Sequence, residues 1–177
     1  MKMKTIIAYK LFEMDTENHL YPLFIDKNTE YPIGEWVQAE NVLYHPGFAS
    51  RPGIHCGMLP AAPHLMSYGP NGEGYYKGRR KNWKRVWVEV ECNCTIDYND
   101  EVAKLSKKCF TDRLPENGWY FFKEYGKTTW LITDKIKILR VLDEQERQEI
   151  LRDVGYNEQQ EWIPYKIALE KRMNVGA

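Results

Sequence analysis

Alternating apolar and polar positions predict several β-strands along the chain. In residues 85–92 three valines and Cys92 alternate with Trp87, Glu89 and Glu91, which is the period-2 pattern of a strand with one buried face. Runs rich in β-branched and aromatic residues predict further strands at 5–12, 118–123 and 128–142. The last of these ranges contains two apolar runs, 128–132 and 135–142.

Turn-forming residues connect some of these strands into hairpins. Residues 15–18 supply turn chemistry between 5–12 and a second apolar run at 20–25. Pro22 removes a backbone donor from that run, so we expect an edge strand or a bulge there. Gly126-Lys127 predicts a hairpin between 118–123 and 128–132.

Helix signals are concentrated in the second half of the chain. Residues 97–108 contain helix formers, with Val102 and Leu105 on one face. Asp143 to Glu146 has the D-x-x-E form of a capping box, which predicts a helix over 143–154 that ends near Gly155. A second C-terminal helix is predicted over 158–173.

Two other segments are less regular. Residues 44–78 contain five prolines and seven glycines, so regular structure must be short there. Residues 35–40 fit either a strand or a single helical turn. These elements together predict an α+β fold, a single domain with a twisted, mainly antiparallel sheet, a loop-rich centre and C-terminal helices. We expect residues 1–142 to form the sheet domain and residues 143–177 to be a helical extension packed on it.

Composition agrees with a folded domain and limits its partners. The 177 residues suit one domain, and 43% hydrophobic residues can form a core. Lys+Arg and Asp+Glu are both 25, which argues against a protein whose main role is to neutralise phosphate or an anionic membrane. No apolar run is long enough to span a bilayer, so no membrane partner and a cytoplasmic location are expected.

The cysteines and histidines are candidates for chemistry. The four cysteines include no C-x-x-C pair, and Cys92 and Cys94 are expected to be buried thiols on one strand face. His45, His55 and His64 cluster in the loop-rich centre, either as a site or as imidazoles that bond to the backbone. Their spacing lacks paired short-range ligands, so we expect no metal.

A basic run occupies residues 77–85 and has six cations with aromatic residues close by. Cations attract phosphate and aromatic rings stack on bases, so Arg79, Arg80 and Lys81 are candidate nucleic-acid contacts. The alternative is a solvated loop before the strand at 85–92.

Several of these segments together carry a family resemblance. Over about Phe48 to Leu142 the chain resembles a family of uncharacterised proteins encoded by phages and other mobile elements, and less specifically the ADP-ribosyltransferase fold. The residues that carry the resemblance are 51–65, 86–91, 118–121, 130–132 and 137–142.

The resemblance implies an NAD site made from three elements. In that fold a first strand carries a His or Arg for NAD, and Tyr9-Lys10 or Tyr44-His45 could take this place. Residues 53–57, followed by 59–65, are similar to the second element beside the nicotinamide. The implied contacts are Arg51 on phosphate, His55 on ribose, and Tyr120 or Tyr9 against the ring, with Gly53 in the second element.

The third element departs from the family pattern. A catalytic Glu would precede the strand at 130–132, where this chain has Thr128-Thr129, and a threonine cannot supply the negative charge. Either Glu124 takes the role, with His55 as the other catalytic candidate, or the protein is not an active transferase.

The expected function is an accessory protein with a degenerate NAD or nucleotide site that acts by binding. Its expected partners are a nucleotide ligand or a host bacterial protein. Two alternatives remain open. One is an active ADP-ribosyltransferase or NAD-processing enzyme, and the other is a nucleic-acid or host-protein binding module that uses residues 77–85.

Overall fold

The computed structural model describes residues 1–24, 26–40, 51–62, 65–68, 70, 74–76, 78, 80–123 and 129–156. A nine-stranded sheet dominates this part of the chain, with the strand order β3-β11-β7-β1-β4-β10-β9-β8 and β2 paired to β1. A separate two-stranded sheet pairs β5 with β6. The bounds of the elements are β1 Thr5–Met14, β2 Leu20–Pro22, β3 Trp36–Gln38, β4 Ile54–Gly57, β5 Ser67–Tyr68, β6 Gly74–Tyr75, β7 Lys84–Asn93, β8 Ile96–Asp97, α1 Asn99–Ala103, β9 Gly118–Lys123, β10 Thr129–Thr133, β11 Lys135–Val141 and α2 Glu144–Asp153.

The predicted strands at 5–12, 85–92 and 118–123 and both runs within 128–142 are confirmed as β1, β7, β9, β10 and β11. The two predicted hairpins are also present, since β1 pairs with β2 and β9 pairs with β10, both antiparallel. β2 is shorter than the predicted run and ends at Pro22, which lies on a strand that pairs with β1 alone. Residues 36–38 form a strand, β3, and not a helical turn.

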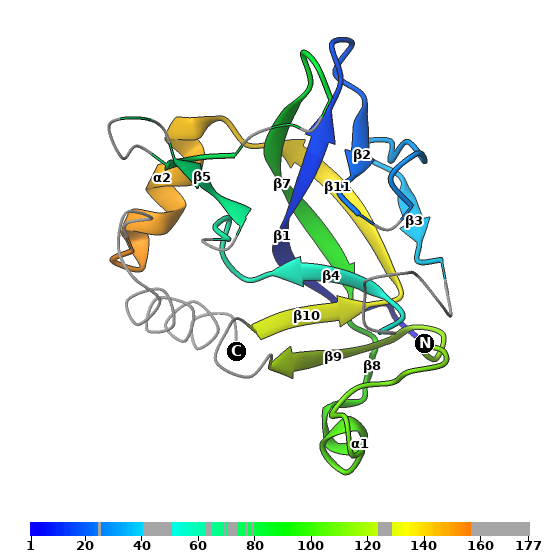
Figure 1. Cartoon of the computed structure of the whole chain (residues 1–177). Coiled ribbons are helices and arrows are strands. Elements are labelled where there is room, and N and C mark those ends of the chain that lie inside the picture. Colours follow the sequence, from blue (N-terminus) through cyan, green and yellow to red (C-terminus); the bar gives the residue numbers. More distant parts are fainter. Residues whose placement is uncertain are drawn as a thin grey trace.

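The large sheet consists of two groups of strands that run in different directions. In Figure 1, β1, β7 and β11 run steeply, whereas β4, β10 and β9 run across them. β1 pairs with β7 over its whole length, from Thr5 to Met14. It pairs with β4 only at Tyr9 and Gly57, so the two groups meet at the middle of β1.

A buried polar cluster lies where β10 turns into β11. Asp134 is 2% exposed, and its Oδ1 accepts from Asn93 Nδ2 at 3.0 Å while its Oδ2 accepts from the Asn117 N–H at 2.8 Å. Thr133 donates its hydroxyl to the carbonyl oxygen of Asn93 at 2.6 Å. Because β10 pairs in one group and β11 in the other, these bonds fix the corner that joins the two groups.

Both termini of helix α2 are capped as the sequence predicts. The Asp143 carboxylate accepts from the Glu146 N–H and the Glu146 side chain accepts from the Asp143 N–H, which completes the capping box. Gly155 has a φ of 72°, and the Tyr156 N–H donates to the carbonyl oxygen of Leu151 at 3.0 Å, which is the Schellman pattern. The predicted helix at 158–173 lies outside the described residues.

The helix predicted at 97–108 is much shorter in the structure. It comprises only the five residues of α1, Asn99–Ala103. Val102 is 4% exposed and packs with Leu114 and Tyr120, whereas Leu105 is 37% exposed. One buried apolar residue gives too little packing to extend a short helix, because helix stability in proteins comes chiefly from an apolar face.

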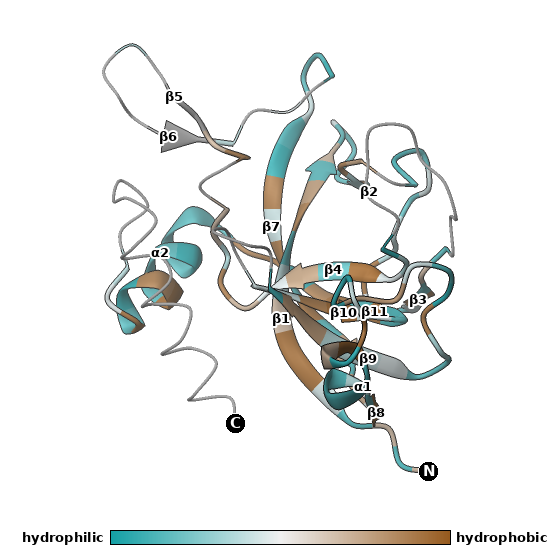
Figure 2. Ribbon diagram, turned by 60° about the horizontal axis from the view of Figure 1, so that its bottom comes forward, coloured by the Kyte–Doolittle hydropathy of each residue, from teal (hydrophilic) through white to brown (hydrophobic). Residues whose placement is uncertain are grey.

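The core lies on both faces of the sheet. The larger cluster contains the inward side chains of β1 and β7, including Ala8, Phe12 and Val88, and it extends to Leu151 of α2. Figure 2 shows α2 as mostly teal with a brown stripe, as expected for a helix with one apolar face. The domain is therefore sheet-rich, with two short helices in the described part, and its named strands pair antiparallel except for β8 and β9.

Candidate functional site at β1, β4 and β10

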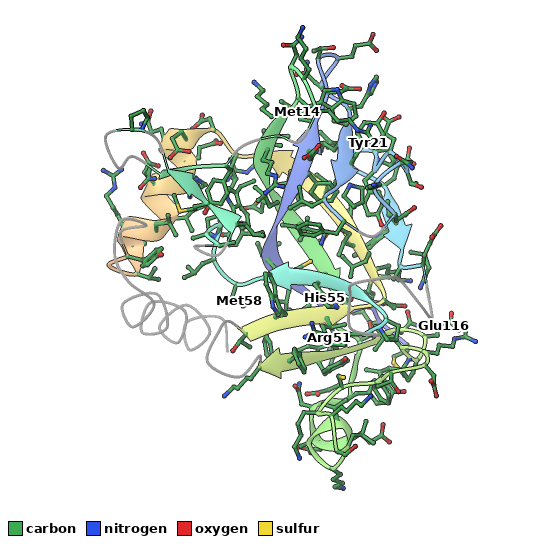
Figure 3. The ribbon with its side chains drawn as sticks, viewed as in Figure 1. Met14, Tyr21, Arg51, His55, Met58 and Glu116 are labelled. Carbon is green, nitrogen blue, oxygen red and sulfur yellow. The ribbon has the colours of Figure 1, made fainter. Side chains whose placement is uncertain are left out.

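Three segments that are far apart in the sequence lie side by side in the sheet. β4 lies between β1 and β10, with Tyr9 opposite Gly57 and Ile132 opposite His55. These strands contain, or directly follow, the three stretches to which the sequence resemblance assigned an NAD site. The structure thus brings together Lys10, His55 and Arg51, and Figure 3 shows Arg51 and His55 close to each other beside β4 and β10.

Lys10 is a cation in an otherwise apolar row. Its neighbours on the same face of β1, Ala8 and Phe12, are both fully buried. Its ammonium donates to the carbonyl oxygen of His55 at 2.9 Å, and burial lowers the pKa of Lys10. No carboxylate among the described residues lies within ion-pair distance of Lys10.

His55 is held as a neutral imidazole. Its Nε2 lies 3.2 Å from the carbonyl oxygen of Arg51. Burial lowers the pKa of His55 to about 4, and the positive charges of Lys10 and Arg51 add to this effect. A carbonyl oxygen can only accept, so the neutral ring carries its proton on Nε2 and presents Nδ1 as an acceptor. A sugar hydroxyl is a suitable donor for that nitrogen.

Arg51 contributes a guanidinium group without an acid. Its guanidinium carbon lies 4.4 Å from the centre of the Phe122 ring, which supports the group by a cation–π contact. Its Nε is buried and has no hydrogen-bond partner within the described ranges. A buried guanidinium donor that lacks an acceptor is costly, so an anionic oxygen would complete this site.

Gly53 has a packing role in the structure. Its φ is 116°, a backbone angle that residues other than glycine rarely adopt. A Cβ at this position would lie 2.5 Å from Cγ2 of Ile132. The segment that precedes β4 packs closely against β10 at this point, and only glycine leaves room for that contact.

Tyr120 is not placed to face a ligand. The residue is fully buried, and its ring packs edge-to-face on Phe110 at 5.7 Å between ring centres. Burial raises the pKa of Tyr120. Tyr9, the other residue expected against a nicotinamide ring, is also buried, at 2% exposed. The sequence did not reveal this, because β-strand aromatics look alike whether they face a ligand or the core.

Several expected site residues lie outside the described residues. These are the catalytic candidate Glu124, the nucleic-acid candidate Arg79, and His45 and His64 of the histidine cluster. Thr128, which occupies the position of the family's catalytic Glu, lies there too.

The four cysteines are free and buried. Interaction with the Cys92 thiol on β7 lowers the pKa of Cys56 on β4, while burial raises that of Cys92. Sequence reasoning missed this contact, since the two residues lie on strands that are not neighbours in the sheet order. Lys10 was named only as part of Tyr9-Lys10, a possible first element of the resemblance, although a lysine between Ala8 and Phe12 in a strand pattern is a visible signal.

The described ranges contain neither a metal-binding cluster nor a helix that could span a membrane. No group of three or more His, Cys, Asp or Glu side chains there is arranged to hold a metal ion. The helices of this part of the chain are too short or too polar for any of them to cross a bilayer.

Comparisons of the chain with protein-family models, curated proteins and solved structures find no match. Any function of this site therefore rests on its own geometry.

Proposed function

We propose that the protein binds NAD or a related nucleotide at the face formed by β1, β4 and β10, and that it acts by binding. The observation that carries the proposal is the pair of cations around His55. Lys10 and Arg51 both lack a carboxylate partner among the described residues, and the Nε of Arg51 is buried without an acceptor. Phosphate oxygens are the acceptors that a guanidinium group binds best.

Each contact in the proposal follows from a property of the side chain. Arg51 binds a phosphate oxygen through its unpaired donors, because Phe122 holds the guanidinium plane in place. His55 accepts a ribose hydroxyl through Nδ1, because Nε2 is engaged with the Arg51 carbonyl oxygen. Lys10 adds a positive charge next to His55, because its ammonium donates to the His55 carbonyl oxygen.

The fit to NAD is incomplete at the ring. Tyr120 and Tyr9 are buried, so the proposal assigns neither of them to the nicotinamide. It also assigns no catalytic carboxylate, because the sequence has Thr128-Thr129 where the family pattern places its Glu. We therefore favour binding over transfer, in keeping with the accessory role that the resemblance to phage proteins implies.

Calorimetry of the full chain with NAD tests this proposal. We expect NAD to bind at millimolar concentration or below, and Arg51→Met to weaken binding by at least about tenfold, because one charge-assisted hydrogen bond contributes roughly 1.5–3 kcal/mol. Arg152→Ala is the matched control, since it removes an exposed arginine from α2. No binding at millimolar NAD, or equal loss in both variants, would overturn the proposal.

A further inference from the structure

A basic turn with stacked aromatic rings lies before β7, next to the tip of the β1–β2 hairpin. The Trp83 N–H donates to the carbonyl oxygen of Arg80 at 3.1 Å, and Asn82 has a φ of 64°, so residues 80–83 form a tight turn. The centres of the Trp83 and Tyr21 rings are 5.1 Å apart. Figure 3 shows Tyr21 far from Arg51 and His55, so this surface is distinct from the proposed nucleotide site.

Arg80 is held in one orientation at this turn. Its guanidinium carbon lies 4.4 Å from the centre of the Trp83 ring, and its Nη2 donates to Asn28 Oδ1 at 3.0 Å. No carboxylate of the described chain pairs with Arg80. A guanidinium group has five N–H donors, so an exposed arginine fixed by one neutral hydrogen bond keeps most of them for a ligand.

Arg80 also lines a shallow cavity of about 160 Å³. Lys27 lines the same cavity and is exposed, with no acid partner among the described residues. Glu13 is the acidic residue of the lining, and it lies 3.7 Å from Arg85, which balances its charge. The cavity thus presents two cations to solvent, one of them in a fixed orientation.

The exposed charges around the cavity are mainly positive and favour the binding of an extended anion. Lys81 and Lys84 follow Arg80 in the sequence and are also exposed. The carboxylates of Asp15, Glu17 and Glu30 lie within 4.0 Å of the ring nitrogens of His19, and their charges also act on Tyr21. Lys27 and residues 80–84 therefore include four exposed cations without an acid partner in the described part of the chain: Lys27, Arg80, Lys81 and Lys84.

We infer that this surface, formed by Tyr21, Lys27 and residues 80–84, docks the backbone of a single-stranded nucleic acid. A phosphodiester matches the forked donors of Arg80, and the further cations can follow successive phosphates. Tyr21 and Trp83 are half-exposed and add the aromatic surface on which unpaired bases stack. A basic surface without aromatic rings would fit a carboxylate-rich peptide equally well.

Fluorescence anisotropy of the full chain with a labelled oligothymidylate of about 12 nucleotides tests this inference. We expect binding at low salt with a linear fall of log K against log salt concentration. The double variant Arg80→Ala/Lys81→Ala should bind about tenfold more weakly at low salt and have a slope about 1.4 units shallower, at roughly 0.7 units for each lost phosphate contact. Tyr21→Ala should weaken binding with an unchanged slope, because it removes a ring and no charge.

The matched control is Lys104→Ala/Lys107→Ala, which removes two exposed cations at and after the end of α1. Figure 1 shows α1 at the opposite end of the molecule from the β1–β2 hairpin. An equal loss in this control, no binding at low salt, or equally tight binding of a polyglutamate peptide would overturn the inference. NAD binding should be unchanged in both double variants, which separates this surface from the proposed nucleotide site.

Discussion

Two buried polar regions of the same sheet differ in how completely they are paired. At the corner between β10 and β11, both carboxylate oxygens of Asp134 accept hydrogen bonds from groups of the fold. At the face of β1, β4 and β10, the ammonium of Lys10 has one carbonyl acceptor and the Nε of Arg51 has none within the described residues. The first region is complete without a ligand, and the second is not.

Arg147 is a buried arginine whose hydrogen-bond acceptors are supplied by the fold. It is 5% exposed, and it bonds to both carboxylate oxygens of Glu144 and to the carbonyl oxygen of Pro60. These contacts attach α2 to the chain after β4. Because the fold supplies acceptors for Arg147 and not for Arg51, the missing acceptor at Arg51 points to a role beyond stability.

The largest effect is expected at the complete corner. Asp134→Ala removes the acceptor of one buried Asn93 Nδ2 proton and of the half-buried Asn117 N–H, while Asn93 Nδ2 keeps its bond to Asn117 Oδ1. We expect the free energy of unfolding to fall by about 3 kcal/mol or more in urea denaturation. The exposed Asp112→Ala should change it by less than about 0.5 kcal/mol. Equal effects in the two variants would mean that the corner does not fix the sheet.

The same substitution should destabilise the protein much more at Arg147 than at Arg51. Arg147→Met leaves the Pro60 carbonyl oxygen without its donor, so we expect a loss of about 2 kcal/mol of stability. Arg51→Met keeps apolar contact with Phe122 and removes an unpaired buried donor, so its stability should fall by no more than about 0.5 kcal/mol. A larger loss in Arg51→Met than in Arg147→Met would make Arg51 a structural residue.

The contributions of His55 and His19 to stability should depend on pH in opposite directions. The folded pKa of His55, about 4, lies below the ordinary value, so the unfolded chain takes up a proton first and stability falls as the pH drops below about 6.5. The effect should be on the order of 1–2 kcal/mol between pH 7 and pH 5. The Asp15 carboxylate raises the pKa of His19, so its contribution is present at low pH and is lost as the pH rises through that pKa.

Denaturation of the wild type and of His55→Gln at pH 5 and pH 7 measures the His55 contribution. The variant should lose less stability on acidification than the wild type. An identical pH dependence in the two proteins would show that His55 is accessible to protons in the folded state.

Much of the fold could be predicted because strand patterns are local. The alternation in residues 85–92 and the capping box at Asp143 depend on neighbours in sequence, and both are found in the structure. The strand order could not be predicted, because β1 pairs with β7 and touches β4 only at Tyr9 and Gly57. The short α1 was also missed, since the exposure of Leu105 depends on what the rest of the fold covers.

The site was predictable only as a set of residue types. Residues 53–57 were assigned by the resemblance to an element of an NAD site, and the structure explains Gly53 by its close approach to Ile132. The sequence could not tell that Tyr120 is buried or that Arg51 stacks on Phe122, because both depend on packing between β4, β10 and β9. Burial and missing partners are three-dimensional properties, and the proposed site rests on them.

The central claim is that the unpaired Nε–H of Arg51 binds an anionic ligand. Its signal in a ¹⁵N-correlated NMR spectrum, assigned with Arg51→Lys, reports this group directly. On addition of NAD we expect the Arg51 Nε–H signal to shift and to exchange more slowly with water, while the signal of Arg147, whose acceptors are supplied by the fold, stays in place. An Arg51 signal that does not move at saturating NAD would contradict the claim.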